Sequence, residues 1–197
     1  MTPILHPSLE TPTISPALYR FQRHQPLSSR KTTLWKIHQG LVRTVTWNDE
    51  GSIITLGFWG PGSWVGWAID QVSPYEIQPL TTITATTVTT HQVIPSRNLL
   101  DHQQQTNIML GILHCHRMET RLLKLLIWLA QRFGQRRSHG IQMQLPLTHQ
   151  EIAETLGTTR VTVTRLINQL EQSDQIQWSR RHQFIPSHTL AIEAGNF

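Results

Sequence analysis

Residues 147–178, LTHQEIAETLGTTRVTVTRLINQLEQSDQIQW, decide how the rest of the chain is interpreted. The segment predicts two short helices, a tight turn between them and the start of a β-hairpin. Thr148 and Glu151 have the spacing of a capping box, so the first helix is expected to begin there. Gly157 predicts its end, because glycine readily adopts the positive φ that follows many helices. Thr158 or Thr159 can then cap a second helix, which runs to about residue 172.

The second predicted helix has two different faces. One face has the i, i+3, i+4, i+7 spacing of a core-packing helix and consists of Val163, Leu166, Ile167 and Leu170. The opposite face carries Arg160, Val161, Thr164, Arg165 and Asn168. Arginine can bond O6 and N7 of guanine together, and an apolar side chain can contact a thymine methyl. An ordinary solvated face would also be polar, but the caps, the turn glycine and both faces together favour a helix that reads DNA.

The charge distribution also favours an anionic partner. The chain of 197 residues has 17 Lys and Arg against 12 Asp and Glu, a net charge of +5. Most of the excess lies in residues 117–182, which hold ten basic and five acidic residues. Double-stranded DNA fits this pattern, and binding should then weaken as the salt concentration rises. With the single cysteine Cys115, neither a disulfide within the chain nor a cysteine-rich metal site can form.

The first 17 residues are proline-rich and predict a flexible arm. They lack the basic start and the apolar run of a signal peptide, and no apolar run in the chain approaches the roughly 20 residues that span a bilayer. We therefore expect a cytoplasmic protein that does not enter a membrane.

Residues 18–95 predict a small antiparallel β-structure. Short apolar segments alternate with turns, and the clearest hairpin turn is Asn48–Gly51 between VRTVTW and SIITLGFW. Further strands are expected over Trp64–Ala68 and over Ile77–Thr90.

Residues 96 to about 133 have a helical pattern with an expected break near Cys115–Arg117. We expect residues 96–116 to form a dimerisation helix, on which Ile108, Ile112 and Cys115 form a seam with Gly111 beside them. The next helix is apolar nearly all round and should support a DNA-binding domain over residues 117–190. The polar segment 134–140 is expected to be a loop, and 141–145 a strand.

After the second helix of the motif, two short strands flank SRRH and predict a wing with Arg180 and Arg181 at its tip. Basic wing tips commonly contact phosphate. Beyond Pro186 the sequence carries no interpretable pattern.

The string GTTRVTVTRLINQLEQSDQI resembles the winged helix-turn-helix of the Crp/Fnr family of bacterial transcription regulators. RVTVTRL is especially similar to the global nitrogen regulators of cyanobacteria within that family. The resemblance extends over roughly residues 35–190, and it implies an α+β fold with an N-terminal double-stranded β-roll, a jelly roll of the cyclic-nucleotide-binding type. It also implies a homodimer on a palindromic operator, a role such as activation, and RNA polymerase as a further partner.

By the family pattern, Arg160 and Arg165 would read bases, and Gln150, Thr159 and Thr162 would contact phosphates or base edges. Val161 stands where many members carry a glutamate that reads cytosine, which favours a GTA-type half-site over a TGTGA-type site.

Cyclic AMP is not expected to bind in the family's usual way. Trp67 stands where the family's ribose-binding glutamate would be, and no Lys or Arg occurs between Gly66 and Thr90 to pair with a cyclic phosphate. Another effector such as 2-oxoglutarate, or none, is then expected. Two alternatives stay open: a metabolite-sensing β-roll whose DNA binding is secondary, and a cupin-like metalloenzyme, although no catalytic or metal-binding motif supports the enzyme.

Overall fold

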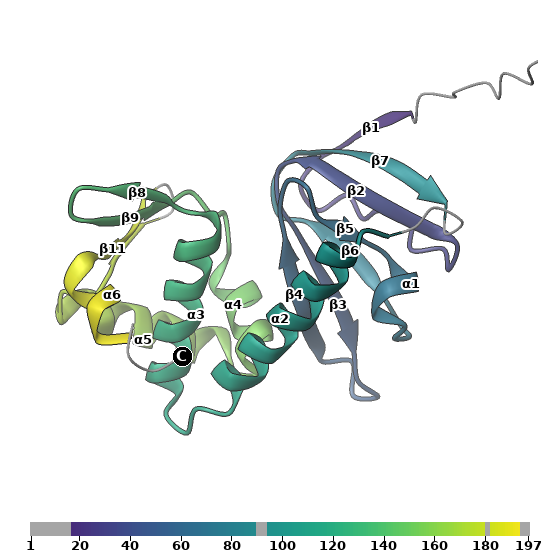
Figure 1. Ribbon diagram of the computed structural model, residues 1–197. Helices are drawn as coiled ribbons and strands as arrows, with labels where there is room; N and C mark the ends of the chain where they lie inside the picture. The colour runs from purple at the N-terminus through teal and green to yellow at the C-terminus, as the bar shows by residue number, and fades with distance from the viewer. Residues whose placement is uncertain (1–16, 90–93, 180–181, 194–197) are drawn as a thin grey trace, which may run out of the picture.

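Two antiparallel sheets form the N-terminal part of the protein in a computed structural model, which describes residues 17–89, 94–179 and 182–193 (Figure 1). One sheet has the strand order β1-β7-β2-β5 and the other β4-β3-β6. Their strands are β1 (Leu18–Phe21), β2 (Thr33–Gln39), β3 (Val42–Trp47), β4 (Ile53–Trp59), β5 (Trp64–Val65), β6 (Glu76–Pro79) and β7 (Ile83–Thr89). The expected β-roll is confirmed.

The interior of the roll is apolar because alternate residues of the strands point into it. Trp35, Ile37, Ile77 and Ile83 are almost fully buried there. The hairpin between β3 and β4 turns at the expected place. The side-chain carbonyl of Asn48 accepts hydrogen bonds from the amides of Glu50 and Ser52 at 3.1 and 2.9 Å, which is a local signal that the sequence carries directly.

Two strand predictions were wrong in extent. The strand expected over 64–68 ends at Val65, and a short helix α1 (Trp67–Asp70) follows. Gly66 makes this change of direction with φ 158°, and a Cβ there would come within 2.7 Å of the Thr33 carbonyl oxygen. The strand expected over 77–90 is two strands, β6 and β7, because the chain turns at Leu80, whose amide donates to the Leu41 carbonyl at 2.8 Å.

Two helices connect the roll to the C-terminal part, and they are interrupted where the sequence predicted a break. The helix α2 (Ser96–Leu113) runs beside β4, and α3 (Met118–Phe133) forms the centre of the C-terminal core. Leu122, Leu125 and Leu126 of α3 have no solvent exposure. The same core includes Phe58 and Leu80 of the roll, so the two parts of the chain share one continuous apolar cluster.

A four-stranded sheet of order β10-β11-β9-β8 forms the wing side of the C-terminal part. Its strands are β8 (Gln135–Arg137), β9 (Gly140–Met143), β10 (Gln177–Trp178) and β11 (Gln183–Pro186). The loop prediction for 134–140 was wrong, because the exposed residues of β8 pair with β9 in a hairpin. The helix α6 (Ser187–Glu193) follows β11, in a stretch where no sequence pattern predicted an element.

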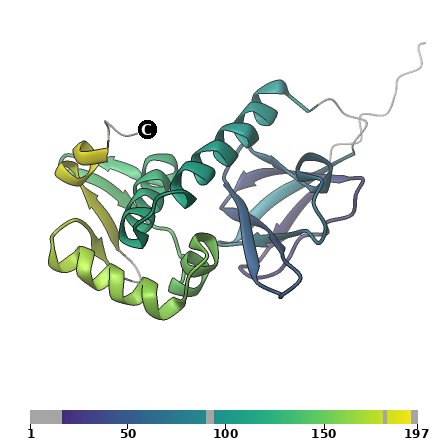
Figure 2. The ribbon, with the colours of Figure 1, turned by 90° about the horizontal axis from the view of Figure 1, so that it is seen from below.

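The helix-turn-helix has the predicted elements, α4 (His149–Leu156) and α5 (Arg160–Gln172). Thr148 and Glu151 form the capping box, and Gly157 ends α4 at φ 64°. The cap of α5 is Thr159, whose side-chain oxygen accepts a hydrogen bond from the Thr162 amide at 3.2 Å. Figure 2 shows α5 along one edge of the C-terminal part, with α4 between it and the roll.

We predict that Leu126→Ala lowers the free energy of unfolding by about 2–5 kcal/mol, because it leaves a cavity among fully buried side chains of α3. Chemical denaturation monitored by circular dichroism measures this. The control is Gln131→Ala on the exposed side of α3, which should change the value by less than about 0.5 kcal/mol. Equal effects of the two substitutions would contradict the central position of α3.

Candidate DNA interface

The helix α5 is held by its apolar face, which leaves the other face free. Val163, Leu166, Ile167 and Leu170 are buried against α3 and α4, as predicted. On the outer face, Val161 is 77% exposed, which is unusual for a valine and leaves its methyl groups available to a partner. The predicted face of Arg160, Val161, Thr164, Arg165 and Asn168 occupies an arc of roughly 140° around the helix.

Arg165 and Asn168 lie on this exposed face, and Thr164 is half-buried. The Arg165 guanidinium donates to the side-chain carbonyl of Gln169 at 3.0 Å, an exposed contact one helical turn along α5. Such a bond orients the guanidinium but costs little to exchange for a base edge. The α5 helix is about 20 Å long at 1.5 Å per residue, and a helix diameter of about 10–12 Å fits the major groove, which is about 12 Å wide.

The first turns of α4 and α5 meet at a hollow of about 390 Å³ lined by Thr148, His149, Gln150 and Arg160. Helix N-termini carry partial positive charge and unpaired backbone amides, and Arg160 adds a full charge. The hollow is therefore suited to an anion such as a DNA phosphate. Gln150 is exposed at its rim, and its amide nitrogen donates to a Glu154 side-chain oxygen at 3.0 Å.

Thr159 and Thr162 share a hydrogen bond between their hydroxyl groups, with the two oxygens 2.9 Å apart. One of the two hydroxyls donates in this bond, so the proton of the other remains available to a phosphate oxygen. The predicted contact role of these two residues is thus compatible with their role in capping α5.

His149 lies between the two helices of the motif, a position that the sequence reasoning did not single out. Its Nδ1 is 2.8 Å from the Thr164 hydroxyl, which itself donates to the Arg160 carbonyl, so the ring donates in this contact. Partial burial lowers the pKa of His149 below its ordinary value of 6.5, and the nearby Arg160 charge lowers it further. The sequence could have indicated His149 through its position at the start of α4, directly after the capping residue Thr148.

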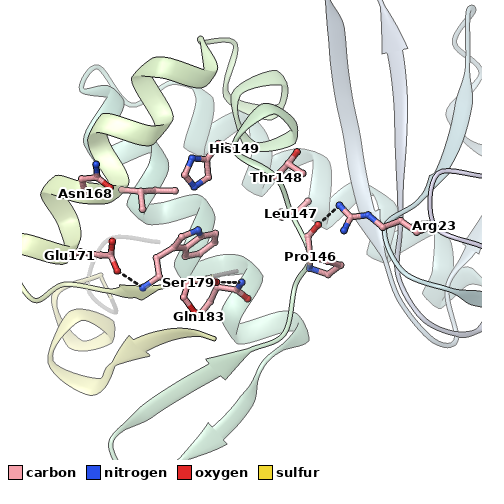
Figure 3. A pocket seen from close by; sticks show the side chains of 11 residues that line it. Arg23, Pro146, Leu147, Thr148, His149, Asn168, Glu171, Ser179 and Gln183 are labelled. Atoms are coloured by element: carbon pink, nitrogen blue, oxygen red, sulfur yellow. Dashed lines mark hydrogen bonds between the residues drawn. The ribbon is translucent and has the colours of Figure 1, made fainter. Parts of the chain in front are cut away.

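A second hollow of about 500 Å³ separates α5 from the wing (Figure 3). His149 and Asn168 line it from the helix-turn-helix, and Arg23 reaches it from the roll. On its wing side, the Glu171 carboxylate accepts a hydrogen bond from the Trp178 amide at 2.8 Å and ties α5 to β10. The predicted wing-tip residues Arg180 and Arg181 lie outside the described residues.

The predicted dimer seam on α2 fits the structure only in part, and its role in a dimer stays a prediction. Ile112 is fully buried within its own subunit, whereas Ile108 is half-buried and packs against the same core. Cys115 lies beyond the end of α2, and its thiol donates back to the Gly111 carbonyl over 3.5 Å. The outward face of α2 instead carries Leu99, Leu100 and Leu110, which are 46%, 63% and 55% exposed, with Gly111 beside them.

Comparisons with known proteins agree with this arrangement. Residues 120–188 match the Crp-like helix-turn-helix domain. Over 175 residues the chain is 37% identical to the regulatory protein CysR of Synechococcus elongatus, and the match covers 87% of this chain and 85% of that protein. The chain belongs to the Crp/Fnr family of transcription regulators. Within this family, the global nitrogen regulator of Synechocystis sp. is 40% identical over 77 residues, although these make up only 34% of its length.

Solved structures show that the Crp/Fnr fold extends over nearly the whole chain. A CRP-family transcriptional regulator of Thermus thermophilus superimposes with a TM-score of 0.74 at 23% identity, covering 89% of this chain and 94% of that one. FixK2 of Bradyrhizobium japonicum gives 0.73 at 15% identity, with coverage of 91% and 96%. At this level of identity the likeness shows the fold alone.

Among residues 17–89, 94–179 and 182–193, no group of three or more His, Cys, Asp or Glu side chains is close enough to hold a metal ion. No helix in the same described part is long and apolar enough to cross a membrane.

We predict that Arg160→Gln raises the pKa of His149 toward its ordinary value, because the substitution removes a positive charge that disfavours the imidazolium. Burial is the larger cause and remains, so the recovery should be partial. As the pH falls through 6.5, His149 becomes protonated in the unfolded chain while the ring in the native protein is still neutral. The unfolded chain therefore binds more protons, and the stability of the native protein decreases as the pH falls. NMR titration of the ring measures the shift.

The matched control for this titration is Arg165→Gln, which removes the same charge from the same helix at a position that does not contribute to the shift. Equal movements of the His149 pKa in both variants would contradict the assignment to Arg160.

Proposed function

We propose that this Crp/Fnr regulator binds a palindromic DNA site as a homodimer, with α5 of each subunit in the major groove. The observation that carries the proposal is the division of α5 into a fully buried apolar face and an exposed face with two arginines and Val161. Arg160 and Arg165 would contact guanine edges, and Val161 would contact a thymine methyl. Gln150, Thr159 and Thr162 would hold the adjacent phosphates, together with Arg180 and Arg181 of the predicted wing tip.

The outward face of α2 supports the homodimer. Leu100 and Leu110 expose large apolar side chains on it, and a Cβ at Gly111 would meet nothing within its own subunit. Glycine on an exposed helix face costs roughly 1 kcal/mol relative to alanine, and nothing within the subunit requires it here. A second α2 packed closely against the first would explain both the exposed leucines and the glycine.

For the roll, we propose that cyclic AMP is not the effector. Trp67 belongs to α1, and the neighbouring Asp70 carboxylate is 3.4 Å from His102 of α2. The stretch from Gly66 to Thr89 has no Lys or Arg to pair with a cyclic phosphate, and the Lys31 ammonium, 4.9 Å from the Trp67 ring centroid, comes from outside that stretch.

Sensing of an anionic metabolite is a second candidate function, and a particular hollow favours it. A cavity of about 530 Å³ lies between the turn 61–63, the start of α2 and the end of α3. Arg97, Asn98 and Arg132 line it, and Asp101 neutralises Arg132 at 2.7 Å. One arginine is left to attract a small carboxylate, a class that includes 2-oxoglutarate.

Selection of bound sequences from random DNA, followed by affinity measurements on the selected site, tests the proposal. We predict that Arg165→Ala lowers the affinity for that site by about 1–3 kcal/mol, with a much smaller loss on random DNA, because a base contact is removed. The control is Arg20→Ala, which removes an exposed charge from β1 of the roll. An equal loss on both DNAs would reassign Arg165 to the phosphate backbone.

We predict that Gly111→Ile converts the homodimer into monomers in analytical ultracentrifugation, because a branched side chain would hold two α2 helices apart. The control, Gln131→Ile, places the same side chain on an exposed position of α3 instead of the outward face of α2. An unchanged dimer in Gly111→Ile would contradict pairing through this face.

A further inference from the structure

The β-roll touches the helix-turn-helix directly, through side chains that are buried between β3, β4 and α4. Thr55 of β4 and Thr155 of α4 are 7% and 3% exposed, with their hydroxyl oxygens 2.9 Å apart. The Thr155 hydroxyl already donates to the Glu151 carbonyl at 2.8 Å, so Thr55 is the donor across the contact. Figure 1 shows α4 beside β4 at this junction.

Arg43 of β3 is the most buried charge at the junction, with 4% of its surface exposed. Its guanidinium nitrogen Nη2 lies 2.7 Å from a carboxylate oxygen of Glu154 on α4. Its Nε donates to the side-chain carbonyl of Gln78 at 2.8 Å, and Gln78 donates to Glu76 at 2.7 Å. The guanidinium thus joins two strands of the roll to the first helix of the DNA-binding motif.

A second arginine of the roll holds the start of the same helix. Arg23 lies 3.3 Å from the Glu151 carboxylate and donates to the Pro146 carbonyl. Glu151 is the capping-box residue and also accepts the Thr148 amide at 2.6 Å. Both carboxylates of α4 that face the roll are therefore paired with its arginines.

These contacts are poorly suited to a purely stabilising role. Among the described residues, Nη1 of Arg43 and Nε of Arg23 are buried without a hydrogen-bond partner. Buried ion pairs commonly add little net stability, but removal of one partner leaves a charge that is costly to bury. Such a pair penalises orientations of the two parts in which one charge stays buried without its partner, and it therefore favours the observed orientation.

The selected orientation leaves the DNA face open. The roll covers the side of α4 that carries Glu151, Glu154 and Thr155, whereas Val161 on α5 stays 77% exposed. Gln150, at the phosphate-facing end of α4, donates to the same Glu154 carboxylate that Arg43 holds.

We propose that Arg43, supported by Arg23 and Thr55, is a positioning residue that fixes the helix-turn-helix on the β-roll in its DNA-competent orientation. The inference rests on the proposed binding of a palindrome by a homodimer. When α5 of each subunit is fixed relative to its roll, binding of one half-site holds the second α5 at a high effective concentration near the other half-site. A helix-turn-helix that is free to move on its roll loses this gain in affinity, although its contacts with each half-site are unchanged.

The test compares a selected palindrome, a single half-site duplex and the palindrome lengthened by one base pair between its half-sites. Arg43→Met should lower the affinity for the palindrome by about tenfold and the affinity for the half-site by less than about twofold. The one-base-pair insertion should weaken the native protein strongly and the variant much less, because the freed domains adjust to the new spacing. Arg20→Met is the charge-matched control and should leave all three affinities near native values.

Thr55→Val extends the test to a variant that keeps every charge. Its partner Thr155 retains the bond to Glu151, so the variant should fold even where Arg43→Met does not, as thermal unfolding would show. It should show the same pattern with a smaller loss on the palindrome. Equal losses on palindrome and half-site, or native affinities in folded variants, would overturn the positioning role. A native protein that prefers no palindrome over a half-site would instead overturn the proposed function.

Discussion

The packing of α5 on α3 is the contact on which the rest of the structure depends. Four apolar side chains of α5 are almost completely buried in a cluster whose centre is α3, a helix with eight buried side chains. Burial of one side chain of this kind contributes about 1.5–3 kcal/mol, so rotation of α5 away from this position is strongly disfavoured. Because one face is fixed inward, Arg160, Val161 and Arg165 must face outward, where they are available to a partner.

The same apolar cluster also places the β-roll. Phe58 and Leu80 belong to the roll but pack into the C-terminal core, with α2 between the two parts. To this apolar contact the roll adds polar side chains that meet α4 and Pro146 just before it, and Arg43 is the most buried of them. Apolar burial thus brings the two parts together, and the directional polar contacts select one relative orientation.

Local signals in the sequence predicted the helix-turn-helix well, because its limits depend on a few neighbouring residues. Thr148, Glu151 and Gly157 each act within one turn of α4, and the two faces of α5 follow from helical periodicity. The face of α2 could not be predicted in this way, since Ile112 and Leu110 are both apolar. Contacts with β4 and α3 decide which of them is buried, and these contacts join residues far apart in the chain.

Two further features depend on contacts between distant residues and could not be predicted from local sequence. The β8 strand consists of exposed polar residues and forms only because β9 offers a free edge, so no hydrophobic pattern predicts it. Arg43 lies in a strand whose alternation places it outside the roll, where solvent would be expected, and its burial follows from the docking of α4.

The most direct measurement of the central claim pairs single atoms of protein and DNA. Each guanine of the selected half-site is replaced by 7-deazaguanine, which lacks the N7 acceptor, and binding is compared for the native protein, Arg160→Ala and Arg165→Ala. If the outward arginines of α5 read guanine, at least one replacement should weaken the native protein clearly and leave one of the two alanine variants unaffected. Losses of equal size in all three proteins at every guanine would show that neither guanidinium contacts a base, and would contradict the account.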